Sequence, residues 1–197
     1  MKTAFSLLQG TLTVEAAGYW YTSGGEKGSF GYYPHLKDDN GHPVYPDTQL
    51  HGDLRMAAAW AGQLGAGRAT SRRIDQLFGK QGNESAALLH VGDLLLSETA
   101  RKEWSKKRFD IKPRIEIDDE SRSVKSGMLA NFEAAWPDGV TLEAPLNIGY
   151  FTDEGEAAQA QQLLHESVHL LSGFGALRSR VYGRGKVRID WQPPRTV

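Results

Sequence analysis

The sequence contains no cysteine, which excludes both a disulfide framework and a thiolate metal site. It also lacks a long hydrophobic run, since no stretch approaches the roughly 20 apolar residues of a membrane-spanning helix. The first residues, MKTAFSLLQGTLTVEA, are interrupted by Gln9, Gly10 and three threonines, unlike the apolar centre of a signal peptide. We therefore expect a cytoplasmic protein without a membrane segment.

An excess of one charge is absent as well, because 23 Lys and Arg residues against 24 Asp and Glu residues give a net charge of −1. The basic side chains are nevertheless clustered. Residues 101–114 carry seven basic and two acidic side chains, and residues 178–188 carry five basic side chains and no acid. Such local density attracts a polyanion whatever the total charge, although solvated surface faces also produce it.

Hydrophobic periodicity predicts alternating strands and helices. Alternation around Leu12 and Val14 indicates a strand, and the spacing of Leu50 and Leu54 indicates an amphipathic helix. The predicted elements are a strand at 3–15, a helix from 47 or 48 to 64, a short helix at 71–78, strands at 86–96 and 146–151, a helix at 156–171 and a strand at 187–191.

Residues 100–145 show little helical period, and turn signals stand at Pro113 and at residues 137–139. We predict that this region forms a hairpin that leaves the core. The order of the other elements matches the β-α-β-β-α-β pattern. The predicted fold class is therefore α+β, a ferredoxin-like core of the RRM type with a thumb-like hairpin insertion, in a single domain over residues 1–197. Such a fold does not by itself define a function.

Residues 165–169 (HESVH) form the H-E-x-x-H pattern of zinc metalloproteases. On a helix, the two histidines of this pattern reach one zinc ion and the glutamate acts as general base. The metzincin spacing for a third ligand falls on Ser172 and Gly175, which do not supply it. Helical periodicity also directs His165 and His169 away from the apolar face. A zinc hydrolase is thus the third hypothesis, and we expect no metal or cofactor.

The same helix is followed by the glycine-rich and arginine-rich run GFGALRSRVYGRGKVRI. It is not a dinucleotide fingerprint, because it follows a helix and precedes a strand. Glycines such as Gly175 let a backbone approach an anion, while Arg178, Arg180 and Arg184 offer contacts to phosphates. Tyr182 is available to stack on a base. An ordinary helix-to-strand connection with surface arginines explains the run equally well.

Three stretches, in order along the chain, resemble one family. SGFGALRSRVYGRGKVRI is similar to its C-terminal glycine-rich loop. HLKDDNGHPVYPDTQLHGDLRMAAAW is similar to its entry into the first helix, with matches at Gly41, Pro43, Pro46, Leu50, Gly52, Leu54 and Arg55. RIEIDDESRSVKSGMLANFEAAWPDGVTLEAPL is similar to its thumb hairpin, with matches at Ile117, Asp118, Ser121, Gly127, Leu129 and Glu133. The family is the repeat-associated mysterious protein (RAMP) superfamily, the RNA-binding subunits of CRISPR effector ribonucleoprotein complexes, in its backbone, type III-like group.

The resemblance implies a backbone subunit that binds a CRISPR guide RNA and presents it for pairing with target RNA. Other copies or related RAMP subunits are implied partners, together with a separate nuclease subunit. The thumb would run from about Arg114 to Leu142, with Met128 and Leu129 as wedge residues. The residues that the resemblance and the charge pattern assign to RNA binding are Lys37, His51, Gly52, Arg55, Arg122, Lys125, Met128, Gly175, Arg178, Ser179, Arg180, Tyr182 and Arg184.

The resemblance leaves an enzymatic role open. Target-cutting members carry an aspartate two residues before the segment that residues 34–38 match, and Tyr32 stands there. A shift of one or two residues in this loop would put Glu26 or Asp38 in that place, and metal-assisted cleavage needs such an acid. We expect no catalytic residue here, with target cutting kept as an alternative.

A second alternative is a metal-independent endoribonuclease that processes CRISPR repeat RNA. Such enzymes use histidine for acid–base catalysis. His51 at the start of the first helix, and His35 or His42 in the preceding loop, are the candidates. A histidine at a helix start is more often structural.

Overall fold

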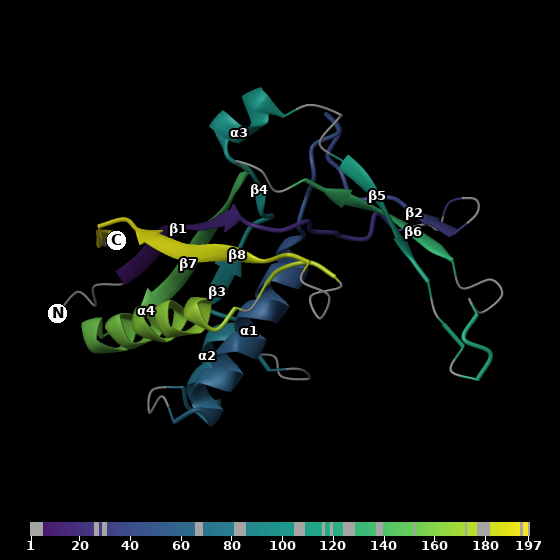
Figure 1. Cartoon of the computed structure of the whole chain (residues 1–197). Helices are drawn as coiled ribbons and strands as arrows, with labels where there is room; N and C mark the ends of the chain where they lie inside the picture. Colours follow the sequence, from purple (N-terminus) through teal and green to yellow (C-terminus); the bar gives the residue numbers. More distant parts are fainter. Residues whose placement is uncertain are drawn as a thin grey trace.

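The computed structural model describes residues 6–25, 28, 31–65, 69–80, 86–104, 109–115, 117–118, 120–123, 129–136, 140–151, 153–171, 173–176, 182–193 and 195–196. Within these residues the chain forms an α+β structure with a larger sheet, a smaller sheet and four helices (Figure 1). No helix among them is long and apolar enough to cross a bilayer.

The larger sheet is antiparallel. Its strands are β1 (Ser6–Ala16), β3 (Leu89–Val91), β4 (Leu95–Leu96), β7 (Thr141–Phe151), β8 (Gly185–Trp191) and β9 (Arg195–Thr196). The order is β3-β7-β1-β8, while β4 also pairs with β7 and β9 with β1. β1 lies at the centre, hydrogen-bonded to β7 on one side and to β8 on the other.

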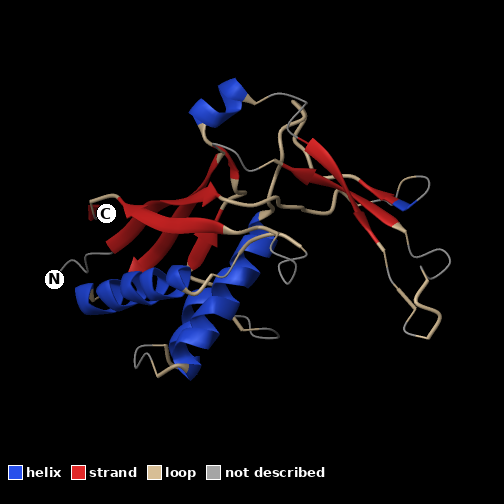
Figure 2. Ribbon diagram, viewed as in Figure 1, coloured by secondary structure: helices blue, strands red, loops and turns tan. Residues whose placement is uncertain are grey.

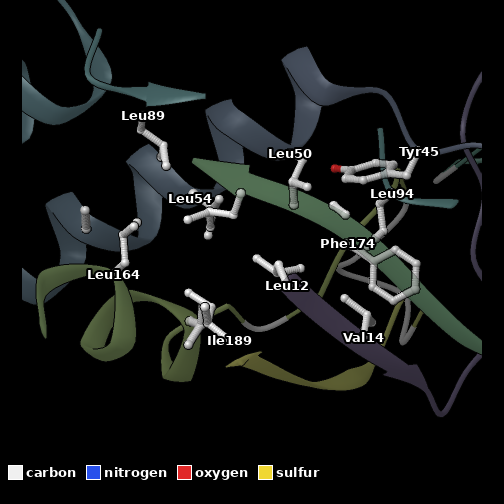
Figure 3. Close-up of a cluster of buried hydrophobic side chains, with 14 of the residues drawn as sticks. Leu12, Val14, Tyr45, Leu50, Leu54, Leu89, Leu94, Leu164, Phe174 and Ile189 are labelled. Atoms are coloured by element: carbon white, nitrogen blue, oxygen red, sulfur yellow. The ribbon is translucent and has the colours of Figure 1, made fainter. Parts of the chain in front are cut away.

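Three helices cover one face of the larger sheet (Figure 2): α1 (Asp47–Gln63), α2 (Ser71–Phe78) and α4 (Glu154–His169). Alternate side chains of the strands point toward them, because successive residues of a strand face opposite sides. Leu12 of β1, Leu54 of α1 and Leu164 of α4 are fully buried in this layer. Figure 3 shows these side chains together with Ile189 of β8, so the core lies between the helices and the sheet.

The smaller sheet has the order β2-β6-β5 and extends away from the core (Figure 1). It consists of β2 (Tyr32–Tyr33), β5 (Phe109–Arg114) and β6 (Ala130–Ala135). β5 and β6 pair antiparallel, as expected for a hairpin within residues 100–145, and β2 adds to β6 in parallel. The backbone of Trp20 pairs with that of Ala135, which joins the end of β1 to the base of this hairpin.

The structure differs from the expected elements in several places, and the sequence pattern did not predict β2 or β9. The predicted strand 86–96 is two short strands, β3 and β4, with Gly92 packed against Pro145 between them. A short helix that the sequence pattern did not predict, α3 (Glu98–Glu103), follows, capped by the Ser97 side chain, which accepts a hydrogen bond from the Ala100 amide. β7 begins at Thr141 rather than at 146, because Leu142 and Ala144 already alternate into the core.

Candidate nucleic-acid interface

The glycine-rich segment, residues 173–176 and 182–185, is anchored by backbone hydrogen bonds to residues 17–21, which follow β1. The Gly183 N–H donates to the Tyr19 carbonyl at 2.6 Å, and the Ala176 N–H donates to the Tyr21 carbonyl at 2.8 Å. Within the segment, the Phe174 N–H donates to the Gly183 carbonyl at 2.9 Å. The two ends of the intervening stretch, which carries the predicted contacts Arg178, Ser179 and Arg180 but lies outside the described residues, are therefore held together.

Two glycines permit this crossing of backbones. Gly175 has φ +82°, and a Cβ there would lie 2.7 Å from the Tyr21 carbonyl oxygen. Gly183 has φ +69°, and a Cβ there would overlap the Phe174 carbonyl oxygen. Phe174 itself is buried, with its ring 5.2 Å from that of Trp20. These glycines thus have a packing role that the sequence pattern does not reveal.

Four other predicted RNA-binding residues lie at accessible places. Arg184 is exposed and Tyr182 half-buried at the end of the glycine-rich segment. Gly52 is exposed on α1, with nothing near the position of an added Cβ. Arg122 is exposed in a turn of the hairpin region, with φ 55°. Lys125 and Met128 were predicted in the same region and lie outside the described residues.

Two predicted RNA contacts, Lys37 and Arg55, are engaged within the protein. The Lys37 Nζ lies 2.7 Å from the Glu133 Oε1 and 4.2 Å from the centre of the Phe109 ring. Arg55 pairs with Asp75 at 2.9 Å and donates to the Gly79 carbonyl, so it joins α1 to α2. A guanidinium held in this way has fewer donors left for a phosphate.

The hairpin presents apolar side chains to solvent. Ile111, Ile115 and Ile117 occupy alternate positions and are exposed, and the predicted wedge residue Leu129 is 49% exposed. Lys112 and Arg114 occupy the intervening positions. Because alternate residues of a strand face opposite sides, Ile111 points away from Lys112 and Arg114 within β5.

The open face of the larger sheet has a different character. On β1 and β8 its described side chains include Thr11, Thr13, Arg188 and Asp190, with no Phe, Tyr or Trp. Arg188 is committed to ion pairs with Glu15 and Asp190. The aromatic stacking that an RRM sheet offers to RNA is therefore lacking on these two strands.

The three candidate histidines occupy separate places. His35 is buried, and burial lowers the pKa of its imidazole to about 3. His42 contacts the Asp38 carboxylate at 3.2 Å. His51 packs edge-on against Phe78, and burial followed by the charge of Arg55 lowers the pKa of its ring. Among the described contacts, none joins His51 to His35 or His42, so the geometry does not favour a histidine acid–base pair.

We expect His35 to make the protein less stable in mild acid. Its folded pKa of about 3 lies below the unfolded value of about 6.5, so the unfolded state takes up a proton first as the pH falls. The contribution of neutral His35 to the free energy of unfolding is fully present above about pH 6.5 and is lost as the pH falls toward 3. About 2 kcal/mol of it is lost at pH 5. Denaturant unfolding of His35→Phe should show about 2 kcal/mol less loss between pH 7.5 and pH 5 than wild type. If the free energy of unfolding fell by the same amount in both proteins, the buried, neutral state of His35 would be contradicted.

The position at which target-cutting members carry an aspartate is occupied by a tyrosine. Tyr32 lies in β2, and burial followed by the charge of Glu133 raises the pKa of its hydroxyl to about 12. Asp38, the alternative acid, accepts hydrogen bonds from the amides of Asn40 and His42 at 2.9 and 2.8 Å. Burial alone would raise the pKa of this carboxyl, but the hydrogen bonds from His42 and Asn40 lower it. Its carboxylate therefore serves to close a turn.

The H-E-x-x-H helix is α4. His165 and His169 are exposed on it with ring centres 4.8 Å apart, and the Gln162 side chain donates to the Glu166 carboxylate. Among the described residues, no group of three His, Asp or Glu side chains is placed to hold a metal ion. The zinc hypothesis thus lacks a third ligand in that part of the chain.

A cavity of about 690 Å³ opens between α2 and α4, away from the glycine-rich segment. Its lining includes the cations Arg72, Arg73 and Lys80 and the anions Asp75 and Glu156. This mixture of charges gives no clear preference for a polyanion.

A family model described as the RAMP superfamily matches residues 13–188, and the chain belongs to this superfamily. The fold is similar to that of a chain in a structure of the type III-B Cmr-beta complex in the apo state (TM-score 0.68, 12% identity, 92% of this chain and 96% of the other). It is also similar to a chain in Cmr-beta bound to cognate target RNA (TM-score 0.65, 13% identity, 93% and 96%). At these sequence identities, the comparison shows a similar fold and nothing more specific. No curated protein matches the sequence.

Proposed function

We propose that the protein is a guide-RNA-binding backbone subunit of a CRISPR effector ribonucleoprotein complex in the cytoplasm. The observation that carries the proposal is membership of the RAMP superfamily over residues 13–188. The likeness in fold to chains of the type III-B Cmr-beta complex, one of them with target RNA bound, supports it.

The core is, in this proposal, ferredoxin-like and of the RRM type. Its strand order β3-β7-β1-β8, with antiparallel neighbours and with α1 and α4 as the two connecting helices, agrees with the β-α-β-β-α-β pattern. Because the sheet face lacks aromatic residues on β1 and β8, this proposal places the RNA elsewhere. We assign it to the glycine-rich segment, the exposed surface of α1 at Gly52, and the hairpin.

The glycine-rich segment contributes Arg184 and Tyr182, together with Arg178, Ser179 and Arg180 of the intervening stretch. The hairpin acts as the thumb. Leu129 and Met128 are its wedge residues, and Arg122 and Lys125 contact phosphates of the RNA. Lys37 and Arg55 contribute indirectly, since ion pairs to Glu133 and Asp75 hold their side chains. Target RNA pairs with the bound guide, which supplies sequence specificity, and cleavage belongs to a separate subunit.

The test compares wild-type protein with the double variant Arg178→Ala with Arg180→Ala, both purified from cells that express the repeat RNA. We expect guide-length RNA on the wild type and much less on the variant. In salt titrations with a single-stranded RNA of guide length, the log–log slope should become shallower by roughly 1.4 if both arginines contact phosphates.

Arg72→Ala with Lys80→Ala is the matched control, because it removes two cations from the cavity between α2 and α4. This variant should bind RNA as the wild type does. Absence of RNA from the wild-type protein overturns the proposal. An equal loss in both double variants contradicts the assignment to the glycine-rich segment.

A further inference from the structure

An aromatic pair, of which Trp136 is exposed and Tyr19 partly buried, lies at the base of the hairpin. Trp136, the residue after β6, has its ring centre 5.0 Å from that of Tyr19 at an interplanar angle of 83°. The Lys112 Nζ lies 3.9 Å from the centre of the Tyr19 ring, and the Tyr19 hydroxyl donates to the Asp110 carboxylate at 3.3 Å. Tyr19 is thus held by a cation over its ring and by a hydrogen bond at its end, while 41% of Trp136 remains exposed.

The backbone around this pair is fixed from two sides. The Ala135 N–H donates to the Trp20 carbonyl at 2.8 Å, immediately beside both aromatic residues. The Tyr19 carbonyl accepts the Gly183 N–H of the glycine-rich segment. The pair therefore lies where the end of β1, the hairpin and the glycine-rich segment meet, although these segments are far apart in sequence.

The charges of the cluster decide what it can contribute. Lys112 lies 2.5 Å from Asp110, so the two charges compensate each other. The cluster therefore adds little net attraction for a phosphate. A rigid, half-exposed indole instead offers a surface on which a nucleobase can stack, a contact that tolerates any base because every base has a π face.

We propose that Trp136, backed by Tyr19, is a stacking site for one base of the RNA strand bound at the glycine-rich segment. The proposal rests on the function proposed above and adds to it a contact that does not depend on charge. Tyr19 is a positioning residue in this arrangement. Removal of the indole should weaken RNA binding at every salt concentration by the same factor, unlike removal of arginines.

The first test measures the affinity of the purified protein for a labelled single-stranded RNA of guide length by fluorescence anisotropy. Trp136→Ala should lose between about 5-fold and 100-fold in affinity, with an unchanged salt slope, and Trp136→Phe should retain most of it. Trp60→Ala is the matched control: Trp60 is 40% exposed on α1 and has no assigned RNA contact. Thermal unfolding of each variant identifies any loss that comes from unfolding.

The second test changes the RNA, so that the loss of a single base is compared in the same folded protein. Single abasic sites are moved along the strand. We expect one position to weaken binding to the wild type and to have no effect on binding to Trp136→Ala. If wild type binds RNA but Trp136→Ala behaves like Trp60→Ala and no abasic position matters, the stacking site is overturned while the proposed function stands. If wild type binds no RNA, the proposed function fails first.

Discussion

Replacing Gly183 with alanine is expected to lower the free energy of unfolding by roughly 3–5 kcal/mol. Gly183 has φ +69°, a conformation that favours glycine, and its added Cβ would overlap the Phe174 carbonyl oxygen. That carbonyl belongs to a buried residue packed against Trp20, so it has little room to move. Residue 183 must then move away either from Phe174 or from Tyr19, and the backbone hydrogen bond to that residue breaks.

Gly41→Ala is the matched control for this substitution. Gly41 also has a positive φ, +79°, but nothing lies within 4 Å of its added Cβ. Its replacement isolates the conformational cost, about 1–2 kcal/mol. Urea unfolding measures both variants, with stability compared at the transition midpoints. Equal losses would contradict the close crossing of the two backbone segments, and RNA binding should fall only for Gly183→Ala.

The helical part of the core could be predicted because its signals are local. Leu50 and Leu54 repeat at helical spacing in α1, and both are buried. α4 begins at Glu154, two residues before the expected start, because the Asp153 side chain accepts a hydrogen bond from the Gly155 amide. β7 was predicted too short, since Pro145 and the turn signal before it are unusual for a long central strand.

The candidate site could be predicted only in part, because its contacts join distant segments. Glycines after α4 indicated an open loop, whereas Gly175 and Gly183 fit against the backbone of residues 17–21. Nothing near Arg55 in sequence indicates its ion pair with Asp75. Trp136 adjoins a turn signal, which gave no indication that Tyr19 would lie against it.

A partly buried ion pair connects two of the segments that carry the family resemblance. Glu133 of β6 is 9% exposed, and its carboxylate accepts hydrogen bonds from the His35 amide at 3.0 Å and from the Lys37 Nζ at 2.7 Å. The Glu133 carbonyl also lies 3.2 Å from the His35 Nδ1. The loop before α1 is thereby attached to the hairpin, although 96 positions separate Lys37 from Glu133.

We expect Glu133→Ala to cost about 1–3 kcal/mol, mainly because it leaves the buried His35 amide without its acceptor. Glu133→Gln should cost less, because its amide oxygen can still accept from His35. Lys37→Met added to Glu133→Gln should restore part of the loss, because it removes the unpaired charge.

The exposed pair Glu98–Lys102 provides the control, because its side chains are 84% and 74% exposed. Glu98→Ala should cost about 0.5 kcal/mol or less. Urea unfolding at neutral pH compares all these variants. A cost for Glu133→Ala as small as that for Glu98→Ala would show that the hairpin is attached to the core by other contacts. A large cost would mean that Glu133 is a main attachment of the hairpin to the loop before α1.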